Sequence, residues 1–197
     1  MTNPNPNRKI IAITGGPCGG KTTLIDELCT DPFYKAGLIP LPESVFYVLQ
    51  TKTSPKEKLF QKMMVEVQAA IENAIDKSVE PGKIILCHRG TLDPLAYWLN
   101  NGWSANDFFS FTQSTLKEHF YRYHAIIHLQ TASVNALADY RLYPDAHRHE
   151  NPKQAEQLDS LLTDTWAEHP NYFFIESNVD WEIKRNVFYK LINSILS

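Results

Sequence analysis

A glycine-rich segment, Gly15 to Thr22, has the residue types and spacing of a phosphate-binding loop. It reads glycine, four residues, glycine, lysine and threonine, so that glycines let backbone N–H groups wrap a phosphate where a helix begins. We expect Lys21 to reach the β- and γ-phosphates of ATP and Thr22 to ligate Mg²⁺. The expected nucleotide-binding residues here are Gly15, Gly16, Pro17, Cys18, Gly19, Gly20, Lys21, Thr22 and Thr23.

The context of this segment decides between a phosphate loop and a plain glycine-rich turn with a surface lysine. Residues 9–14 form a short apolar, β-branched run that is typical of a buried parallel strand. Helical patterning follows from Lys21, with Leu24 and Leu28 on one face. A strand before the loop and a helix after it favour the phosphate loop.

Three residues further along the chain could act on a phosphate acceptor. Glu43 ends an expected second strand, where it would suit a base that takes a proton from a hydroxyl; the alternative is a solvated loop glutamate. Arg89 follows another expected strand and could face the phosphates, or form a surface salt bridge. Gln68, on a long helix, could hydrogen-bond a substrate or be a plain surface amide.

The position for a magnesium-directing carboxylate, at the end of the strand before Arg89, holds His88. Asp93 could substitute as a metal partner through water, or it could cap the helix expected over residues 95–99. Arg141 and Arg148 lie in a polar segment near 140–150, which we predict to be a lid whose arginines close on the transferring phosphate. A solvated basic loop is the alternative.

The composition indicates an ordinary globular protein of 197 residues with 43% hydrophobic residues and a formal net charge of −3. Such a charge gives no general attraction to nucleic acid, so the expected partners are a nucleotide and a small-molecule acceptor. No apolar run approaches the ~20 residues that span a bilayer, and the start lacks the apolar region of a secretory signal. Three cysteines without metal-type spacing suit a reducing compartment, so we expect a cytoplasmic protein.

Strand and helix patterns alternate along the whole chain. Strands are expected over 9–14, 38–43, 83–87, 125–129 and 172–175, and Ser54, Pro55 and Glu57 are the signature of a helix start. This alternation predicts an α/β three-layer sandwich, with a mainly parallel sheet and ligands bound at the carboxyl edge of its strands. We expect a polar tail over 1–8 and one domain over 9–197.

Four segments together resemble the NadR/Ttd-type AAA-domain family of P-loop ATPases. They are residues 11–23, Pro42-Glu43, His88-Arg-Gly-Thr-Leu-Asp93 with Ala96-Tyr97, and Glu176-Ser-Asn178 with Trp181-Glu-Ile-Lys184. That family includes the ribosylnicotinamide kinase domain of NadR, and eukaryotic members regarded as GTP-binding regulators. Its fold is similar to that of nucleoside and nucleotide kinases.

The resemblance implies roles for particular residues. Arg89 matches the arginine of the family's Asp-Arg-Gly element, Glu43 matches its Pro-Glu element, and the segment around Ser177 and Asn178 corresponds to the loop that embraces the nucleotide base. This sequence departs from the family at His88, where an acid usually stands.

Two functions therefore compete. The first is an ATP- and Mg²⁺-dependent kinase that phosphorylates a nucleoside-like hydroxyl acceptor, and the second is a nucleotide-binding switch or slow NTPase that serves a protein or lipid partner. Convergence of Glu43, Gln68 and Arg89 would favour the kinase, and their dispersal would favour the switch. The oligomeric state and the preference for ATP over GTP stay open.

Overall fold

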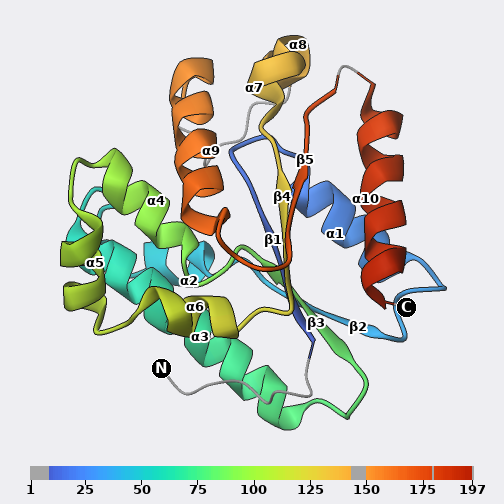
Figure 1. Ribbon diagram of the computed structural model, residues 1–197, viewed down its shortest axis with the longest axis horizontal. Helices are drawn as coiled ribbons and strands as arrows, with labels where there is room; N and C mark the ends of the chain where they lie inside the picture. Colours follow the sequence, from blue (N-terminus) through green and yellow to red (C-terminus); the bar gives the residue numbers. More distant parts are fainter. Residues whose placement is uncertain (1–8, 143–149, 179, 197) are drawn as a thin grey trace.

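A five-stranded sheet lies at the centre of the described part of the molecule. The computed structural model describes residues 9–142, 150–178 and 180–196, with side chains from 141 and 142 left out. All neighbouring strands are parallel, in the order β2-β3-β1-β4-β5 (Figure 1). The strands are β1 (Ile10–Thr14), β2 (Leu38–Leu41), β3 (Ile84–His88), β4 (Ala125–Leu129) and β5 (Tyr172–Ile175). The predicted parallel α/β fold is confirmed.

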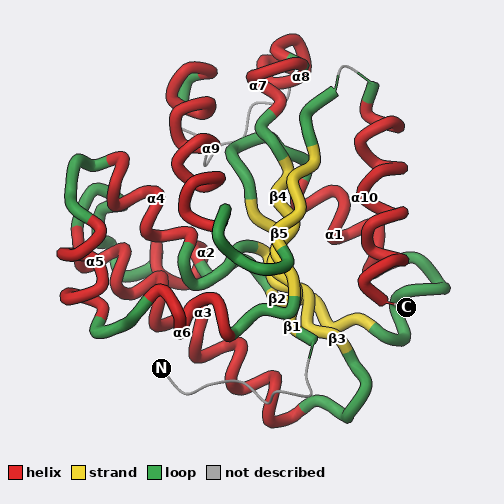
Figure 2. The backbone as a smooth tube through the Cα atoms, in the orientation of Figure 1, coloured by secondary structure: helices red, strands yellow, loops and turns green. Residues whose placement is uncertain are grey.

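Helices cover both faces of the sheet, as the tube view shows (Figure 2). The described helices are α1 (Lys21–Thr30), α2 (Val45–Leu49), α3 (Lys58–Ser78), α4 (Asp93–Asn100), α5 (Ala105–Thr112), α6 (Leu116–Tyr121), α7 (Ala132–Asn135), α8 (Leu137–Leu142), α9 (Pro152–Trp166) and α10 (Trp181–Leu196). Helices α1 and α10 pack on one side, and α3, α4, α5, α6 and α9 lie on the other (Figure 1).

Strand β1 shows how the sequence builds two cores from one strand. Its side chains alternate between the faces: Ile11 and Ile13 pack with α1 and α10, while Ile10 and Ala12 pack with α3, α4 and α9. All five residues of β1 are buried, as expected for a central parallel strand. The strand therefore holds the following loop at a fixed position on the carboxyl edge.

Helix α3, strand β2 and strand β3 begin or end at other residues than predicted. Helix α3 begins at Lys58 rather than near Ser54, because Ser54 and Glu57 close a separate turn in which the Ser54 carbonyl accepts from the Glu57 N–H at 2.8 Å. Strand β2 ends at Leu41, two residues before Glu43. Strand β3 extends through His88, which pairs in register with Ile13 of β1.

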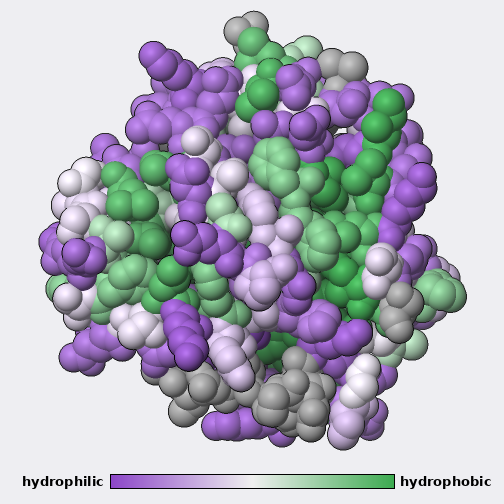
Figure 3. Space-filling view, in the orientation of Figure 1, coloured by the Kyte–Doolittle hydropathy of each residue, from purple (hydrophilic) through white to green (hydrophobic). Residues whose placement is uncertain are grey.

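Strand β5 is at one edge of the sheet and has apolar surface beside it. Figure 3 shows hydrophobic surface between β5 and α10, and Phe174, Ile183 and Val187 are exposed side chains of these elements.

Within the described part of the chain, no helix combines the length and apolar character needed to cross a membrane. The predicted tail over 1–8 and the central part of the predicted lid, 143–149, lie outside the described residues.

Candidate active site

The glycine-rich loop leaves β1, passes against the backbone of Leu129 at the end of β4 and enters α1. Gly15 has a φ of 125°, and a Cβ atom there would stand 2.0 Å from the carbonyl oxygen of Leu129. Gly20, the residue before α1, has a φ of 87°, and its missing Cβ makes room for the Trp181 ring. Cys18 has a positive φ of 56°, which is uncommon for a residue with a side chain. The loop thus has the tight, glycine-dependent path of a phosphate-binding loop.

Lys21 is buried at the first position of α1. Its ammonium donates to the carbonyl oxygens of Gly15 at 2.9 Å and Gly16 at 2.7 Å, so the side chain lies back across the loop. Burial, together with the nearby positive charge of Arg89, lowers the pKa of Lys21 to about 7. A phosphate beside the ammonium would favour its charged form, because an opposite charge raises the pKa of an amine.

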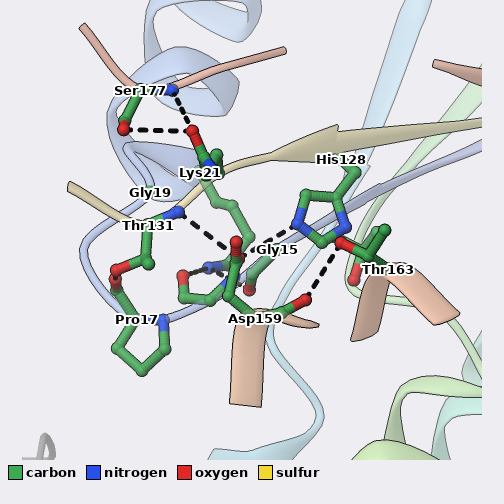
Figure 4. Close-up of polar contacts among 12 residues, drawn as sticks. Gly15, Pro17, Gly19, Lys21, His128, Thr131, Asp159, Thr163 and Ser177 are labelled. Carbon is green, nitrogen blue, oxygen red and sulfur yellow. Dashed lines mark hydrogen bonds and ion pairs between the residues drawn. The ribbon is translucent and has the colours of Figure 1, made fainter. Parts of the chain in front are cut away.

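An aspartate from α9 holds the outer side of the loop. One carboxylate oxygen of Asp159 accepts from the Gly16 N–H at 2.5 Å and the Thr131 N–H at 3.3 Å, and it contacts Nε2 of His128 at 3.0 Å. Figure 4 shows the Asp159 side chain between Thr131 and His128, facing the loop. The Thr131 hydroxyl donates to the Pro17 carbonyl at 2.6 Å. The loop, the end of β4 and α9 therefore meet at this point.

A lysine from α10 holds the opposite side. The ammonium of Lys184 donates to the carbonyl oxygens of Gly19 at 2.8 Å and Gln130 at 2.7 Å, joining the loop to the end of β4. Burial lowers the pKa of Lys184 to about 8. No role was predicted for Asp159 or Lys184 from the sequence. The sequence signal that could have indicated such a role is their position, because each is a charged residue within the buried stripe of its amphipathic helix.

Glu43, His88 and Arg89 lie together beside the loop. Oε1 of Glu43 is 3.4 Å from Nε of Arg89 and 3.5 Å from Nδ1 of His88. Nη1 of Arg89 also donates to the Gly15 carbonyl at 3.3 Å, so the arginine reaches the phosphate loop. Its φ of 74° is unusual for a non-glycine residue and is typical of strain at functional sites.

The neighbouring groups determine which members of this cluster are charged. Burial alone would raise the pKa of Glu43, but the basic groups around it, namely His88 when protonated, Arg89 and Lys21, hold it below its ordinary value. Burial lowers the pKa of His88 to about 4, which leaves its imidazole neutral at pH 7. Glu43 is therefore an anion with a partly exposed side chain, at 22% exposure, beside a fixed guanidinium.

Gln68 joins the same group from α3. Its Nε2 donates to Oε1 of Glu72 at 2.9 Å and to the carbonyl oxygen of Arg89 at 3.3 Å, and its side chain is buried. The surface-amide alternative is therefore wrong. Glu72 is in turn paired with Arg122 at 2.7 Å, within the buried layer between α3 and β3. Glu43, Gln68 and Arg89 converge, as the kinase hypothesis requires.

Asp93 is a structural partner of this arrangement. It is the first residue of α4, and its carboxylate accepts from the Thr14 hydroxyl at 2.7 Å, the Trp166 indole N–H at 2.8 Å and Nη1 of Arg89 at 3.2 Å. The alternative prediction, that Asp93 caps a helix over residues 95–99, is wrong, because that helix is α4 and begins at Asp93 itself. Both carboxylate oxygens accept from protein donors, and the metal role of Asp93 through water stays a prediction.

Thr22 stays a predicted ligand of a divalent cation. Thr22, in the first turn of α1, is exposed, and its hydroxyl lies 3.0 Å from Nε2 of His88. Within residues 9–142, 150–178 and 180–196, no three His, Cys, Asp or Glu side chains are grouped to hold a metal by themselves. Any cation here would need phosphate oxygens or water as further ligands, which is the usual way that Mg²⁺ is bound with nucleotides.

The remaining predicted residues lie at the same edge or outside the described side chains. Ser177 follows β5, and its N–H donates to Oε1 of Gln130 at 2.9 Å. Asn178 accepts from the Asp180 N–H at 3.0 Å and closes the turn before α10. Both stay predicted nucleotide-binding residues. The Arg141 side chain and all of Arg148 lie outside what the structure describes.

Comparisons with known proteins agree with this geometry. A family model described as an AAA domain matches residues 10–184. No curated protein matches the sequence. Among solved structures, deoxyadenosine kinase from M. mycoides with bound dATP has a TM-score of 0.62 at 18% identity, covering 94% of this chain and 100% of that one. The same enzyme with the products dCMP and dCDP has a TM-score of 0.63 at 18% identity, covering 94% and 99%. These structures share the P-loop α/β fold, and the chain belongs to the AAA-domain family.

Proposed function

We propose that this protein is an ATP- and Mg²⁺-dependent kinase that transfers the γ-phosphoryl group to a hydroxyl of a nucleoside-like acceptor. The observation that carries the proposal is the convergence of Glu43, Arg89 and Gln68 beside the phosphate loop. A phosphate loop alone serves many nucleotide-binding proteins. A carboxylate, an arginine and a buried amide gathered next to it form an acceptor side, which a simple switch does not need.

The shared fold supports the choice of acceptor class. The similar solved structures are of a deoxyadenosine kinase, with bound dATP, dCTP or the products dCMP and dCDP. The motif resemblance to the ribosylnicotinamide kinase domain of NadR points to the same class, a ribose or deoxyribose hydroxyl. Adenosine- or nicotinamide-type nucleosides are thus the first acceptors to test.

The residues divide the work as follows. Lys21 and the loop N–H groups bind the β- and γ-phosphates, and Arg89 and the lid arginines Arg141 and Arg148 stabilise charge on the moving group. Glu43 accepts the proton of the acceptor hydroxyl, since its Oε1 faces Arg89 and His88 while its side chain remains partly exposed. The cation, bound at Thr22, would neutralise charge on the phosphate oxygens.

Gln68 is proposed to bind the acceptor. Its Oε1 is buried and has no hydrogen-bond partner among the described atoms, whereas its Nε2 is fixed by Glu72 and Arg89. A buried acceptor atom without a partner costs about 1–3 kcal/mol, so a ligand that donates to it gains affinity and selectivity. An N–H or O–H group of the acceptor would satisfy it.

The test is Glu43→Gln, which keeps size and polarity but removes the base. We expect phosphoryl transfer to the acceptor to fall by ~10²-fold or more, because general-base catalysis is worth that much, while ATP affinity changes little. Radiolabelled ATP with a panel of nucleosides measures the first quantity, and calorimetry the second. Glu66→Gln, at an exposed position of α3, is the matched control. Transfer at the wild-type rate in Glu43→Gln would refute the assignment of the base.

The alternative is a nucleotide-binding switch or slow NTPase with a protein or lipid partner. One observation favours it, namely His88 where related proteins carry an acid. In that case Glu43→Gln would alter only the cation dependence of nucleotide affinity, or nothing at all. Nucleotide binding without transfer to any nucleoside would favour the switch.

A further inference from the structure

The contact between His88 and Thr22 has the spacing of two ligands on one cation. Nε2 of His88 and Oγ1 of Thr22 are 3.0 Å apart. Two neighbouring ligands of an octahedral ion, each bound at ~2.1 Å, are separated by about 3.0 Å. The pair can therefore ligate a single ion without moving apart, if that ion takes the place of the hydroxyl hydrogen bond.

The other ring nitrogen of His88 makes no hydrogen bond among the described atoms and has a carboxylate as its neighbour. Nδ1 lies 3.5 Å from Oε1 of Glu43, and the imidazole side chain is only 9% exposed. A histidine that binds a metal usually directs its second nitrogen at a carboxylate, which fixes the tautomer and turns the lone pair toward the ion. With a proton on Nδ1 facing Glu43, the lone pair of Nε2 faces Thr22.

Asp93 and Glu43, the acids described beside this place, are each paired with other side chains. Asp93, the nearest acid on the following helix, is occupied by Thr14, Trp166 and Arg89. Glu43 reaches the site through His88. Among the described residues, the His88 imidazole is the side chain that hydrogen-bonds the Thr22 hydroxyl.

We propose that His88 is a direct ligand of the divalent cation that enters with the nucleotide, through Nε2 and beside Oγ1 of Thr22, with Glu43 as its orienting partner. The inference rests on the proposed nucleotide site and adds its cation chemistry. A nitrogen ligand favours transition ions over Mg²⁺, since imidazole suits ions such as Co²⁺ and Zn²⁺ better than it suits Mg²⁺. The site therefore prefers a transition ion to a greater degree than an all-oxygen site does.

Pulsed electron paramagnetic resonance of the full chain with Mn²⁺ and ATP tests the ligation directly. Natural-abundance protein should show a directly bound ¹⁴N, and protein carrying ¹⁵N-histidine should show the ¹⁵N pattern instead. This isotope exchange needs no mutation, and it separates histidine from the nitrogens of adenine. Mn²⁺ that is held only by Thr22, phosphate and water would show no change on labelling, and that result overturns the proposal.

Calorimetry of ATP with Co²⁺ or Mg²⁺ tests the preference. His88→Asp should lower the ratio of Co²⁺- to Mg²⁺-supported ATP affinity by ~10-fold or more, the scale on which metal sites respond to changes near the ion. His124→Gln, exposed at the opposite edge of the sheet before β4, should leave the ratio unchanged. An unchanged ratio in folded His88→Asp contradicts the proposal. A wild-type chain that binds no nucleotide refutes the proposed function and this inference together, whereas ATP binding without histidine ligation refutes this inference alone.

Discussion

Asp159→Ala should loosen the phosphate loop from outside the site. In the wild-type protein a single carboxylate oxygen accepts from Gly16, Thr131 and His128, at 2.5, 3.3 and 3.0 Å. Gly16 has no Cβ at the point where Asp159 approaches, since a Cβ there would lie 2.7 Å from that oxygen. Alanine removes the acceptor and leaves two buried backbone N–H groups without it.

The cost follows from those two N–H groups. Each buried donor without a partner costs about 1–3 kcal/mol, and water entering the vacated space offsets part of this cost. Nε2 of His128 also loses its partner, and Nδ1 of the same ring already makes no hydrogen bond among the described atoms. We therefore expect Asp159→Ala to lower the free energy of unfolding by about 2–4 kcal/mol. Asp159→Asn keeps an oxygen acceptor but loses its charge, so about 1 kcal/mol is expected.

Urea unfolding and ATP calorimetry measure the two consequences. Helix α9 offers a matched control, Asp164→Ala, because Asp164 is exposed on the same helix; its effect should stay within about 0.5 kcal/mol. If the loop loses its position, ATP affinity in Asp159→Ala should also fall by ~10-fold, which corresponds to about 1.4 kcal/mol. Asp159→Ala with the stability and affinity of Asp164→Ala would show that this contact does not hold the loop.

Two further predictions concern charge. Lys21→Ala should weaken ATP binding by ~10-fold to ~100-fold in calorimetry, since charged hydrogen bonds contribute about 1.5–3 kcal/mol; Lys35→Ala, at an exposed position, should not. Burial lowers the pKa of His119 from 6.5 to about 3, so between these values the unfolded chain binds a proton that the folded chain excludes. The free energy of unfolding should therefore decrease as the pH falls from about 6 to about 4, and His119→Gln should reduce that slope by about 1.4 kcal/mol per pH unit in urea unfolding. Equal slopes in both proteins would contradict the buried neutral imidazole.

The parts of the fold that follow from local pattern were predictable. Strand β1, the glycine-rich loop and the start of α1 are adjacent in sequence, and their residue types carry the signal in one short window. Short apolar runs likewise located β3, β4 and β5. The predicted start of α3 was wrong because the Ser54 hydroxyl and the Glu57 carboxylate accept from nearby backbone N–H groups in an isolated turn, much as they would at the start of a helix.

The supports of the loop were not predictable from those windows. Asp159 lies 143 residues from Gly16, and Lys184 lies 165 residues from Gly19. Each is an ordinary charged residue by type, and only the tertiary packing brings it to a backbone group. Burial could be inferred from the helical stripe, but the partner could not, because many loops end at the same edge of the sheet.

His88 shows how one substitution can redirect a site without removing it. The register of β3 against β1 places position 88 beside the phosphate loop whatever residue stands there. An acid at that position would add a negative charge next to Glu43, which the neutral imidazole avoids. Glu43 can then remain ionised between His88 and Arg89, which is the state that a base requires. The departure at His88 is thus compatible with the proposed role of Glu43 as a base, because an acid at position 88 would have disfavoured the ionised form of Glu43.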